Sequence, residues 1–264
     1  STLKRWIDAG HLKAEKTPGG HRKVAVADLL AFLRSRGRSA PSLEGLAALA
    51  IASDAAPSPE ALAGLLVRGD TAVARSMVIG EFNAGQRLEE ILDRLVASAM
   101  IEIGAQWARG ALDVYEEHLA TLRVWSILVE LRGMLPVPPP SAPLALGGAP
   151  EGDPYMLPTL MAELTLADMG WRTANLGPDT PVESFLGAIE AQEPRLVWVS
   201  ITSRTPRRAF FEGYPRMFDA AESRGIRIAL GGQGLTPELQ DRVVASAFGT
   251  RLAHLKAFAR TLSG

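Results

Sequence analysis

The chain has 264 residues, 47% of them hydrophobic, and a formal net charge of -1. This length exceeds what one compact core usually needs, so we expect two or three domains. No long apolar run predicts a membrane span and no signal-peptide pattern opens the chain, so we expect a cytoplasmic protein that does not contact a membrane. The sequence contains no cysteine, which excludes disulfides, thiolate metal sites and cysteine nucleophiles.

Charge is distributed unevenly along the chain. Residues 1–38 carry a net charge of +6, and the remaining residues carry -7. A basic head on an acidic body favours a polyanion as the partner of the head alone, although a solvated basic surface gives the same charge pattern.

The first predicted elements form a small helical head with a tight turn. Residues 1–10 place apolar side chains at helical spacing and end on a glycine, and residues 27–36 predict a second short helix. Between them, Pro18-Gly19-Gly20 permits the chain to reverse. The cations that follow, His21, Arg22 and Lys23, then lie on a returning strand that can meet phosphates.

The helix containing Thr2 and Trp6, followed by Thr-Pro-Gly-Gly-His-Arg at 17–22, resembles the MerR and excisionase-like winged helix-turn-helix proteins. The resemblance covers residues 1–38 and implies DNA contacts of two kinds. It implies that the major groove is contacted by Thr2, Lys4 and Arg5. It also implies that a wing against the DNA backbone contains His21, Arg22 and Lys23. The first helix of that family would precede Ser1, so we expect further residues upstream. A peptide- or protein-binding module is the alternative for this head.

Two linkers and a helical segment follow. Residues 39–58 are rich in Ala, Ser and Pro and predict a linker with a short helix at 43–51. Residues 136–143 are too rich in proline for a helix and predict an extended spacer. Between the linkers, residues 59–135 show apolar side chains at helical spacing, interrupted by Gly69, Gly85 and Gly110. We therefore expect an antiparallel four-helix bundle.

Residues 144–264 change to short apolar runs that alternate with helical patterns. Strands are predicted at 144–147, 172–176, 196–201 and 227–230, with a weaker one near 245–248. Helices are predicted at 155–169, 182–192, 207–223, 237–243 and 252–262. This alternation predicts a doubly wound, flavodoxin-like parallel sheet, whose ligands bind beyond the carboxyl ends of the strands.

The bundle contains one spacing of interest, in which nine residues separate Trp107 from the pair Glu117-His118. Alone, a core tryptophan and a surface histidine explain it. The order of bundle, proline linker and doubly wound sheet, however, resembles the CarA/CarH/LitR regulators over essentially the whole chain. In that family the bundle caps adenosylcobalamin held on the α/β domain, and light breaks the cobalt–carbon bond to alter oligomer and DNA affinity. The resemblance implies that Trp107, Glu117 and His118 cover the 5′-deoxyadenosyl group.

The same family places an acid-x-His-x-x-Gly motif after the first strand, and its histidine coordinates cobalt. Here Asp153 matches the acid, but Tyr155 replaces the histidine and Pro158 the glycine. A phenol must lose a proton before it can bind cobalt, so Tyr155 predicts that no protein side chain ligates the metal from below. Ala108 stands where light-adapted members carry a second histidine ligand.

Two further elements match the pocket that lines the cobalamin nucleotide loop in this family. They are Ser200-x-Thr202 after the third strand and Gly231-Gly232 after the fourth. Glycines there let a flat ligand approach the backbone closely, but loops of α/β domains contain such residues without any ligand as well.

These observations predict a DNA-binding transcriptional regulator, a repressor by the resemblance, rather than an enzyme. Its partners are double-stranded DNA at paired half-sites and further copies of itself in a dimer or tetramer. Its sensor half is expected to bind cobalamin without a histidine lower ligand and with no other metal site. The alternatives are another tetrapyrrole, another flat aromatic molecule, or no ligand and control by a partner protein. An enzymatic alternative, a corrinoid methyl carrier, is opposed by Tyr155 and by the basic head.

Overall fold

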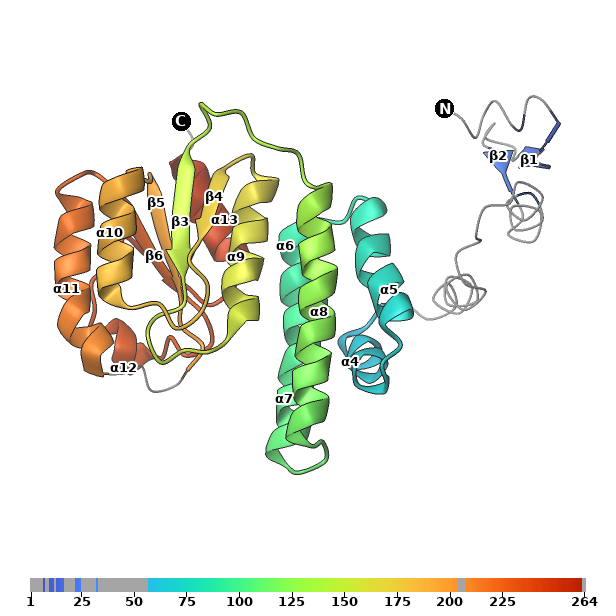
Figure 1. The fold of residues 1–264 in the computed structure, drawn as a ribbon, viewed down its shortest axis with the longest axis horizontal. Helices are drawn as coiled ribbons and strands as arrows, with labels where there is room; N and C mark the ends of the chain where they lie inside the picture. Colours follow the sequence, from blue (N-terminus) through green and yellow to red (C-terminus); the bar gives the residue numbers. More distant parts are fainter. Residues whose placement is uncertain are drawn as a thin grey trace. The chain divides into compact units, whose positions relative to one another are not determined.

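The computed structural model describes residues 7, 10–11, 13–16, 22–24, 32, 57–203 and 208–262. The chain divides into two compact units, Ser1–Ala56 and Pro57–Gly264 (Figure 1). In the first unit, strand β1 (Glu15–Lys16) pairs antiparallel with β2 (Arg22–Lys23), which confirms the predicted reversal of the chain. The helices predicted at 1–10 and 27–36 lie outside the described residues except for Ile7, Gly10 and Phe32, and the linker up to residue 56 lies wholly outside them.

The second unit begins with the predicted bundle of four helices. They are α4 (Pro59–Arg68), α5 (Thr71–Asn83), a third helix made of α6 (Leu88–Glu90), η1 (Ile91–Ala97) and α7 (Ser98–Ala108), and α8 (Val114–Met134). The Ser58 hydroxyl accepts a hydrogen bond from the Ala61 amide at 3.2 Å and starts α4. The turns fall at the three predicted glycines, which adopt φ values of 88°, 85° and 73°. Such positive φ angles are costly for other residues.

The third helix is wound as a π-helix over Ile91–Ala97. A π segment takes more residues per turn than an α-helix and is uncommon. Here it keeps Ile91, Leu92 and Leu95 in the bundle core while Asp93 points away from that core toward α13. None of the described helices, this one included, is long and apolar enough to cross a bilayer.

Residues 144–262 form a five-stranded sheet with helices on both faces (Figure 1). The strands are β3 (Leu144–Gly148), β4 (Arg172–Asn175), β5 (Leu196–Ser200), β6 (Arg227–Gly231) and β7 (Ala247–Gly249). All pairs are parallel and the order is β4-β3-β5-β6-β7. This is the flavodoxin-like order, so the predicted fold class is confirmed.

The helices of this part are α9 (Met156–Asp168), α10 (Val182–Gln192), α11 (Arg208–Glu222), α12 (Pro237–Gln240) and α13 (Leu252–Thr261). One apolar cluster joins the sheet to α10 and α11, and another joins it to α9 and α13. The helix predicted at 237–243 is shorter than expected, because after Gln240 the chain turns toward β6, where Ser246 pairs with Ile228 through two hydrogen bonds.

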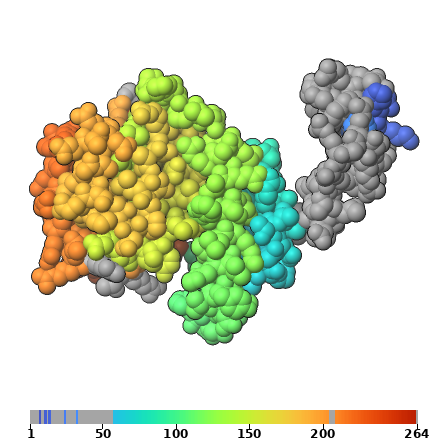
Figure 2. All heavy atoms as spheres, viewed as in Figure 1, coloured from blue at the N-terminus to red at the C-terminus, as the bar shows by residue number. Residues whose placement is uncertain are grey.

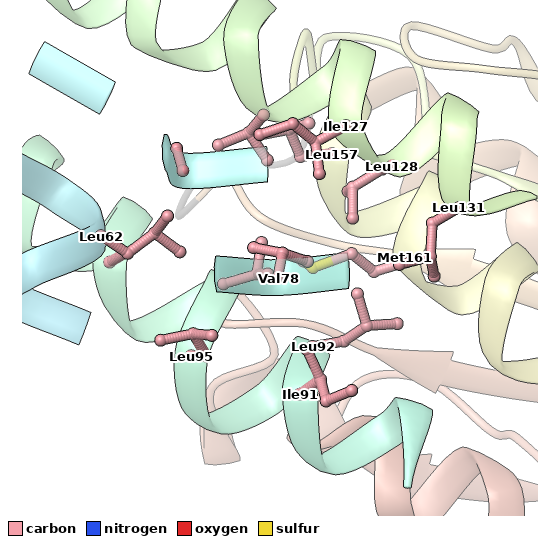
Figure 3. Packing of buried hydrophobic residues seen from close by; sticks show 14 of the residues in the cluster. Leu62, Val78, Ile91, Leu92, Leu95, Ile127, Leu128, Leu131, Leu157 and Met161 are labelled. Carbon is pink, nitrogen blue, oxygen red and sulfur yellow. The ribbon is translucent and has the colours of Figure 1, made fainter. Parts of the chain in front are cut away.

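The bundle and the sheet part share a hydrophobic core. Its residues come from all four helices of the bundle and from α9, as Figure 3 shows for Leu128 and Leu131 beside Leu157 and Met161. The predicted division into domains 59–135 and 144–264, separated by the proline-rich spacer at 136–143, remains a proposal. The spacer contains neither helix nor strand, as its composition predicts.

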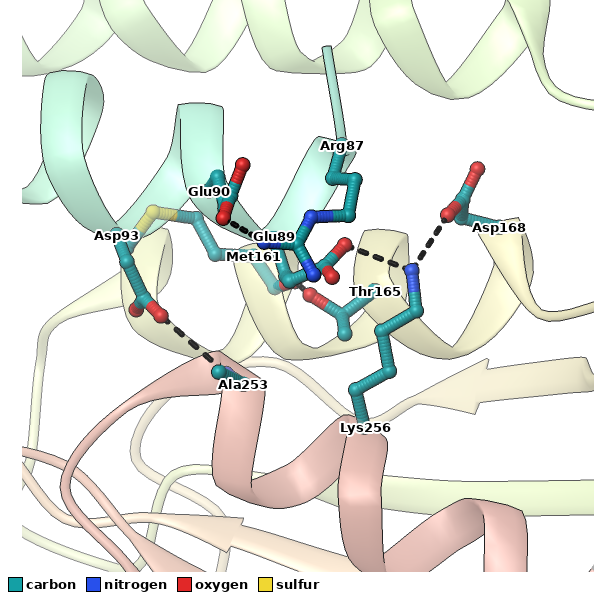
Figure 4. Close-up of polar contacts among 9 residues, drawn as sticks. All are labelled: Arg87, Glu89, Glu90, Asp93, Met161, Thr165, Asp168, Ala253 and Lys256. Carbon is teal, nitrogen blue, oxygen red and sulfur yellow. Dashed lines mark hydrogen bonds and ion pairs between the residues drawn. The ribbon is translucent and has the colours of Figure 1, made fainter.

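Polar contacts also join the third helix of the bundle to α13 (Figure 4). The Lys256 ammonium lies 2.7 Å from a carboxylate oxygen of Glu89 and 3.2 Å from one of Asp168. The Asp93 carboxylate accepts hydrogen bonds from the Leu252 and Ala253 amides at 3.0 and 3.2 Å, and so caps the first turn of α13.

Candidate ligand-binding site

Six of the predicted ligand-binding residues lie at one edge of the sheet. Because all five strands are parallel, their carboxyl ends share this edge, and the topological switch point falls between β3 and β5. The six follow or end three neighbouring strands, β3, β5 and β6: Asp153, Tyr155, Ser200, Thr202, Gly231 and Gly232.

Asp153 is the polar centre of this edge. Its side chain is 1% exposed, and one carboxylate oxygen accepts hydrogen bonds from the backbone amides of Thr202 and Ser203 at 2.5 and 2.8 Å. The other oxygen accepts from the Tyr155 amide at 3.2 Å. The carboxylate therefore ties the loop after β3 to the loop after β5 across the switch point, and this satisfies a buried charge.

Helix α9 begins at Met156, so Tyr155 immediately precedes the helix that was predicted to begin with it. The tyrosine is half-exposed. The loops after β3, β5 and β6 contain no histidine in the sequence, and His254 lies on α13 against Gly249. Among the described residues, no three His, Cys, Asp or Glu side chains gather where they could hold a metal ion. The edge thus offers a phenol, but no imidazole, to a ligand.

The side chains that follow β5 include one unsatisfied polar group. The Thr202 hydroxyl is buried and has no hydrogen-bond partner within the described residues, while Ser200 beside it is 6% exposed. A buried hydroxyl without a partner costs free energy, and a polar group of a bound molecule would supply the missing bond.

The glycines after β6 have a packing reason of their own. Gly232 has φ +111°, and a Cβ added to it would lie 2.2 Å from the Ile201 carbonyl oxygen. A Cβ on Gly231 would lie 2.9 Å from the Gly249 carbonyl oxygen. These glycines let three loops of the sheet edge pack against one another, so they require no ligand to explain them.

An indole fills the space beneath this edge. A Cβ on Gly147, in β3, would lie 2.1 Å from the Trp198 side chain, which is 2% exposed. The Trp198 Nε1–H donates to the Thr159 hydroxyl at 3.0 Å, and that hydroxyl donates to the Asn175 amide oxygen at 3.0 Å. A ligand tail that enters between β3 and β5 therefore meets a tryptophan.

The same polar chain extends to the bundle. The Asn175 amide donates to Glu163 at 3.0 Å, and the Arg132 guanidinium, on α8, lies 3.3 Å from the Glu163 carboxylate. Sequence reasoning missed this series of polar contacts and the position of the Trp198 side chain. Two adjacent glycines ending β3 were the available signal, because they allow a large side chain on the neighbouring strand to approach the backbone.

The predicted cap residues lie at the end of the bundle formed by the turn between α7 and α8. In Figure 1 this end extends past the carboxyl edge of the sheet. Trp107 is 48% exposed near the end of α7. Glu117 and His118 touch, with 3.7 Å between Nε2 and a carboxylate oxygen, and their side chains are 26% and 69% exposed. An exposed tryptophan at this end of the bundle is available to cover a flat molecule.

Two surface hollows lie away from these residues. One is lined by residues before β5 and β6, including Glu193, Arg195 and Arg224, and the other by α10 and α11. Both lie outside the carboxyl edge, where ligands of this fold bind, so neither is a candidate for the predicted ligand.

Comparison with known proteins identifies the helical part of the chain. Residues 59–124 match the protein family described as "B12 binding domain". The chain thus contains a B12-binding-type domain. Over 120 residues it is 32% identical to the HTH-type transcriptional repressor CarA of Myxococcus xanthus, which covers 45% of this chain and 40% of CarA.

Two further curated proteins are similar. The chain is 28% identical over 163 residues to the repressor CarH of Myxococcus xanthus, covering 60% of this chain and 52% of CarH. It is 20% identical over 179 residues to the dimethylamine corrinoid protein of Methanosarcina barkeri, covering 66% of this chain and 82% of that protein. The chain therefore spans about half or less of the two repressors.

The fold has a close structural counterpart. The Methanosarcina barkeri monomethylamine corrinoid protein superposes with a TM-score of 0.60 at 16% identity, covering 75% of this chain and 94% of that one. At this level of identity the likeness concerns the fold alone, which this chain shares with that corrinoid protein.

Proposed function

We propose that this protein is a DNA-binding transcriptional repressor of the MerR type whose sensor half has the cobalamin-binding fold. The similarity to CarA and CarH, two HTH-type repressors, carries the proposal. The basic segment 1–38 and its β1–β2 hairpin support it, because a winged head needs such a hairpin beside the DNA backbone. A cytoplasmic protein without catalytic activity, binding double-stranded DNA as a dimer or tetramer, fits this role.

The head is proposed to read DNA with the residues given above. Thr2, Lys4, Arg5 and His21 lie outside the described residues, and Arg22 and Lys23 form β2. Each phosphate contact adds to affinity for every sequence and steepens the dependence on salt.

Replacing Arg22 and Lys23 together by alanine tests the wing. Fluorescence anisotropy with a random-sequence duplex should show weaker binding at every salt concentration, and the slope of log affinity against log salt should become shallower by about two. The matched control replaces two cations of the other unit, Arg208 and Arg224, and should leave the slope unchanged. Unaltered affinity in the first variant would refute the wing.

For the sensor half, we propose that the carboxyl edge of the sheet and the α7–α8 end of the bundle face opposite sides of a corrinoid. Thr202 supplies a polar group below, and Trp107, Glu117 and His118 cover it from above. When bound, adenosylcobalamin supplies a light-sensitive cobalt–carbon bond, the basis of the photoreceptor role. Since Tyr155 stands at the lower-ligand position, the protein would hold the cofactor without supplying an imidazole to its cobalt.

A second version keeps the regulator and changes its ligand. Trp198 supports it, because the indole occupies the space beneath the sheet edge, and so does the packing reason for Gly231 and Gly232. Here the sensor binds another tetrapyrrole or flat aromatic molecule, or responds to a partner protein without any ligand.

Dark incubation with adenosylcobalamin, desalting and a visible spectrum separate the two versions. The first predicts a coloured protein with the spectrum of a corrinoid that has no histidine ligand from the protein. Tyr155→His is the informative variant, since it restores an imidazole and should change that spectrum to one with histidine on cobalt. A colourless native protein would exclude the cobalamin version and leave the DNA-binding role intact.

A corrinoid methyl carrier is the enzymatic alternative, and the similarity to the dimethylamine corrinoid protein supports it. The absence of a histidine at position 155 and the basic segment 1–38 oppose it. Methyl transfer to a thiol from the methylcobalamin-treated protein would establish it.

A further inference from the structure

Helix α8 carries an exposed apolar stripe in addition to its buried face. Five apolar side chains spaced by four, three, three and four residues lie on one side of the helix. They are Tyr115 (62% exposed), Leu119 (43%), Leu122 (53%), Trp125 (42%) and Val129 (43%). Figure 2 shows α8, in green, on the surface of this view with nothing over it.

The stripe is separate from the side of α8 that holds the bundle together. Ala120, Val124, Ile127, Leu128 and Leu131 are each 3% exposed or less and belong to the bundle core. The stripe lies on the opposite side, so packing within this unit does not explain its apolar character.

The charges beside the stripe already have partners within the chain. On one flank Glu130 pairs with Arg75 of α5, and on the other Arg132 pairs with Glu163 of α9. Besides Tyr115 itself, His118 is the titratable side chain on this side of α8. An apolar strip bordered by satisfied charges is the usual composition of a protein interface, in which the centre is dry and the rim is polar.

The area of the stripe suits a small but specific interface. With roughly 200 Å² per large side chain, five residues that are about half-exposed present about 500 Å². A monomer seldom exposes a larger patch without a function. Two such surfaces together bury about 1,000 Å², the lower limit for a specific association.

The spacing of the stripe is symmetric about its centre. Leu122 is preceded at three and seven positions by Leu119 and Tyr115, and followed at three and seven positions by Trp125 and Val129. An antiparallel copy of the helix therefore places Leu122 against Leu122, Leu119 against Trp125 and Tyr115 against Val129. A two-fold contact needs such a self-complementary surface.

We propose that α8 is a homodimer interface in which two copies of this chain pair antiparallel about Leu122. The same pairing sets His118 opposite Ser126, which is exposed between Trp125 and Val129. It joins no like charges across the contact. The interface goes beyond the proposed DNA-binding role and requires neither DNA nor cobalamin.

Single cysteines test the geometry, because the natural chain has none. In the full chain, Leu122→Cys should cross-link to itself with a short bis-maleimide. Tyr115→Cys should not, because two copies of residue 115 lie about 21 Å apart along antiparallel helices. A mixture of Tyr115→Cys and differently tagged Val129→Cys should yield the heterodimer. The control, Val137→Cys, lies in the exposed linker and should remain monomeric on the gel.

A charge at the centre tests the energetics. Leu122→Glu places two carboxylates together on the two-fold axis. Sedimentation equilibrium should show that the dissociation constant of the dimer rises at least a hundredfold. Val137→Glu is the matched control, at a residue 91% exposed, and should change nothing. Both variants replace exposed side chains, and circular dichroism checks that they fold.

Each contrary result overturns the proposal. A native chain that stays monomeric at high micromolar concentration means that the stripe has another occupant, such as residues 1–56 or a different protein. Self-cross-linking of Tyr115→Cys means a parallel pair, and a dimer insensitive to Leu122→Glu means another surface. Because these assays contain no DNA and no corrinoid, their outcome is independent of the proposed function.

Discussion

Lys256→Met tests whether ionic contacts hold the bundle against α13. The Lys256 side chain is 12% exposed and bridges Glu89, whose side chain is 5% exposed, and Asp168, which is 27% exposed. Methionine fills a similar volume but carries no charge. The substitution therefore leaves the Glu89 carboxylate buried without its cation, while Asp168 can still reach water.

The magnitude follows from the geometry. At 2.7 Å the Glu89–Lys256 attraction is about 6 kcal/mol for an effective dielectric constant of about 20. Desolvation of both groups offsets much of this value, and removing one partner of a buried pair typically costs about 3–5 kcal/mol. Because some water reaches the lysine, we expect about 3 kcal/mol, which for a unit of this size lowers Tm by about 6–12 °C.

The stability deficit of Lys256→Met should also depend on pH, in a direction that follows from the pKa of Glu89. Burial alone raises the pKa of Glu89, but the hydrogen bond from Lys256 and its charge bring the net pKa below the usual 4.5. A depressed pKa stabilises the folded chain above pH 4.5, and this contribution is lost as the pH falls through the lowered value. In Lys256→Met the effect of burial is no longer opposed by the lysine, so the pKa of Glu89 rises and the deficit should shrink on acidification.

Urea unfolding followed by the fluorescence of the buried tryptophans, at pH 7.5 and pH 5, measures the deficit. Glu89→Gln combined with Lys256→Met is the control, because it removes the buried charge together with its partner and should recover much of the loss. A deficit below about 0.5 kcal/mol, or one that grows at pH 5, would refute this account of the contact.

Two further substitutions test the sheet edge. Gly147→Ala drives a methyl into Trp198 and should destabilise the chain by about 3 kcal/mol or more in urea unfolding. The control, Gly187→Ala in α10, adds a Cβ that meets nothing within 4 Å and should stabilise the chain by about 0.5 kcal/mol. Equal changes in the free energy of unfolding for the two variants would contradict the packing of Gly147 against Trp198. Asp153→Ala removes the acceptor of three amide hydrogen bonds and should cost about 3 kcal/mol. It should also speed amide exchange at Thr202, and unchanged exchange there would show that the carboxylate does not hold the loop.

The sequence predicted the elements well because its local signals were strong. Glycines mark the bundle turns, and continuous apolar runs such as 196–200 mark parallel strands that are buried on both faces. Gathering Asp153, Ser200 and Gly231 at one edge followed from the parallel topology alone. Tyr155 could be recognised as an obstacle to metal ligation from its residue type, before its position was known.

The contacts between distant segments could not be predicted in this way. Lys256 and Glu89 are 167 residues apart, and each belongs to a helix whose own pattern gives no reason to pair them. Trp198 belonged to an apolar run that predicted a strand, and nothing in that run indicated that its side chain fills the space beside Gly147. Such contacts depend on how helices cross the sheet, which periodicity does not determine.

The π-helical segment Ile91–Ala97 determines the direction in which the side chains of residues 98–108 face around the axis of the third helix. Deleting one residue there would let the segment wind as an α-helix and would rotate residues 98–108 by about 100° relative to the segment before it. Either Asp93 would then lose its contact with α13, or Ile103 would leave the bundle core. A single inserted residue thus lets one continuous helix satisfy two partners, α13 along its first half and the exposed end of the bundle along its second.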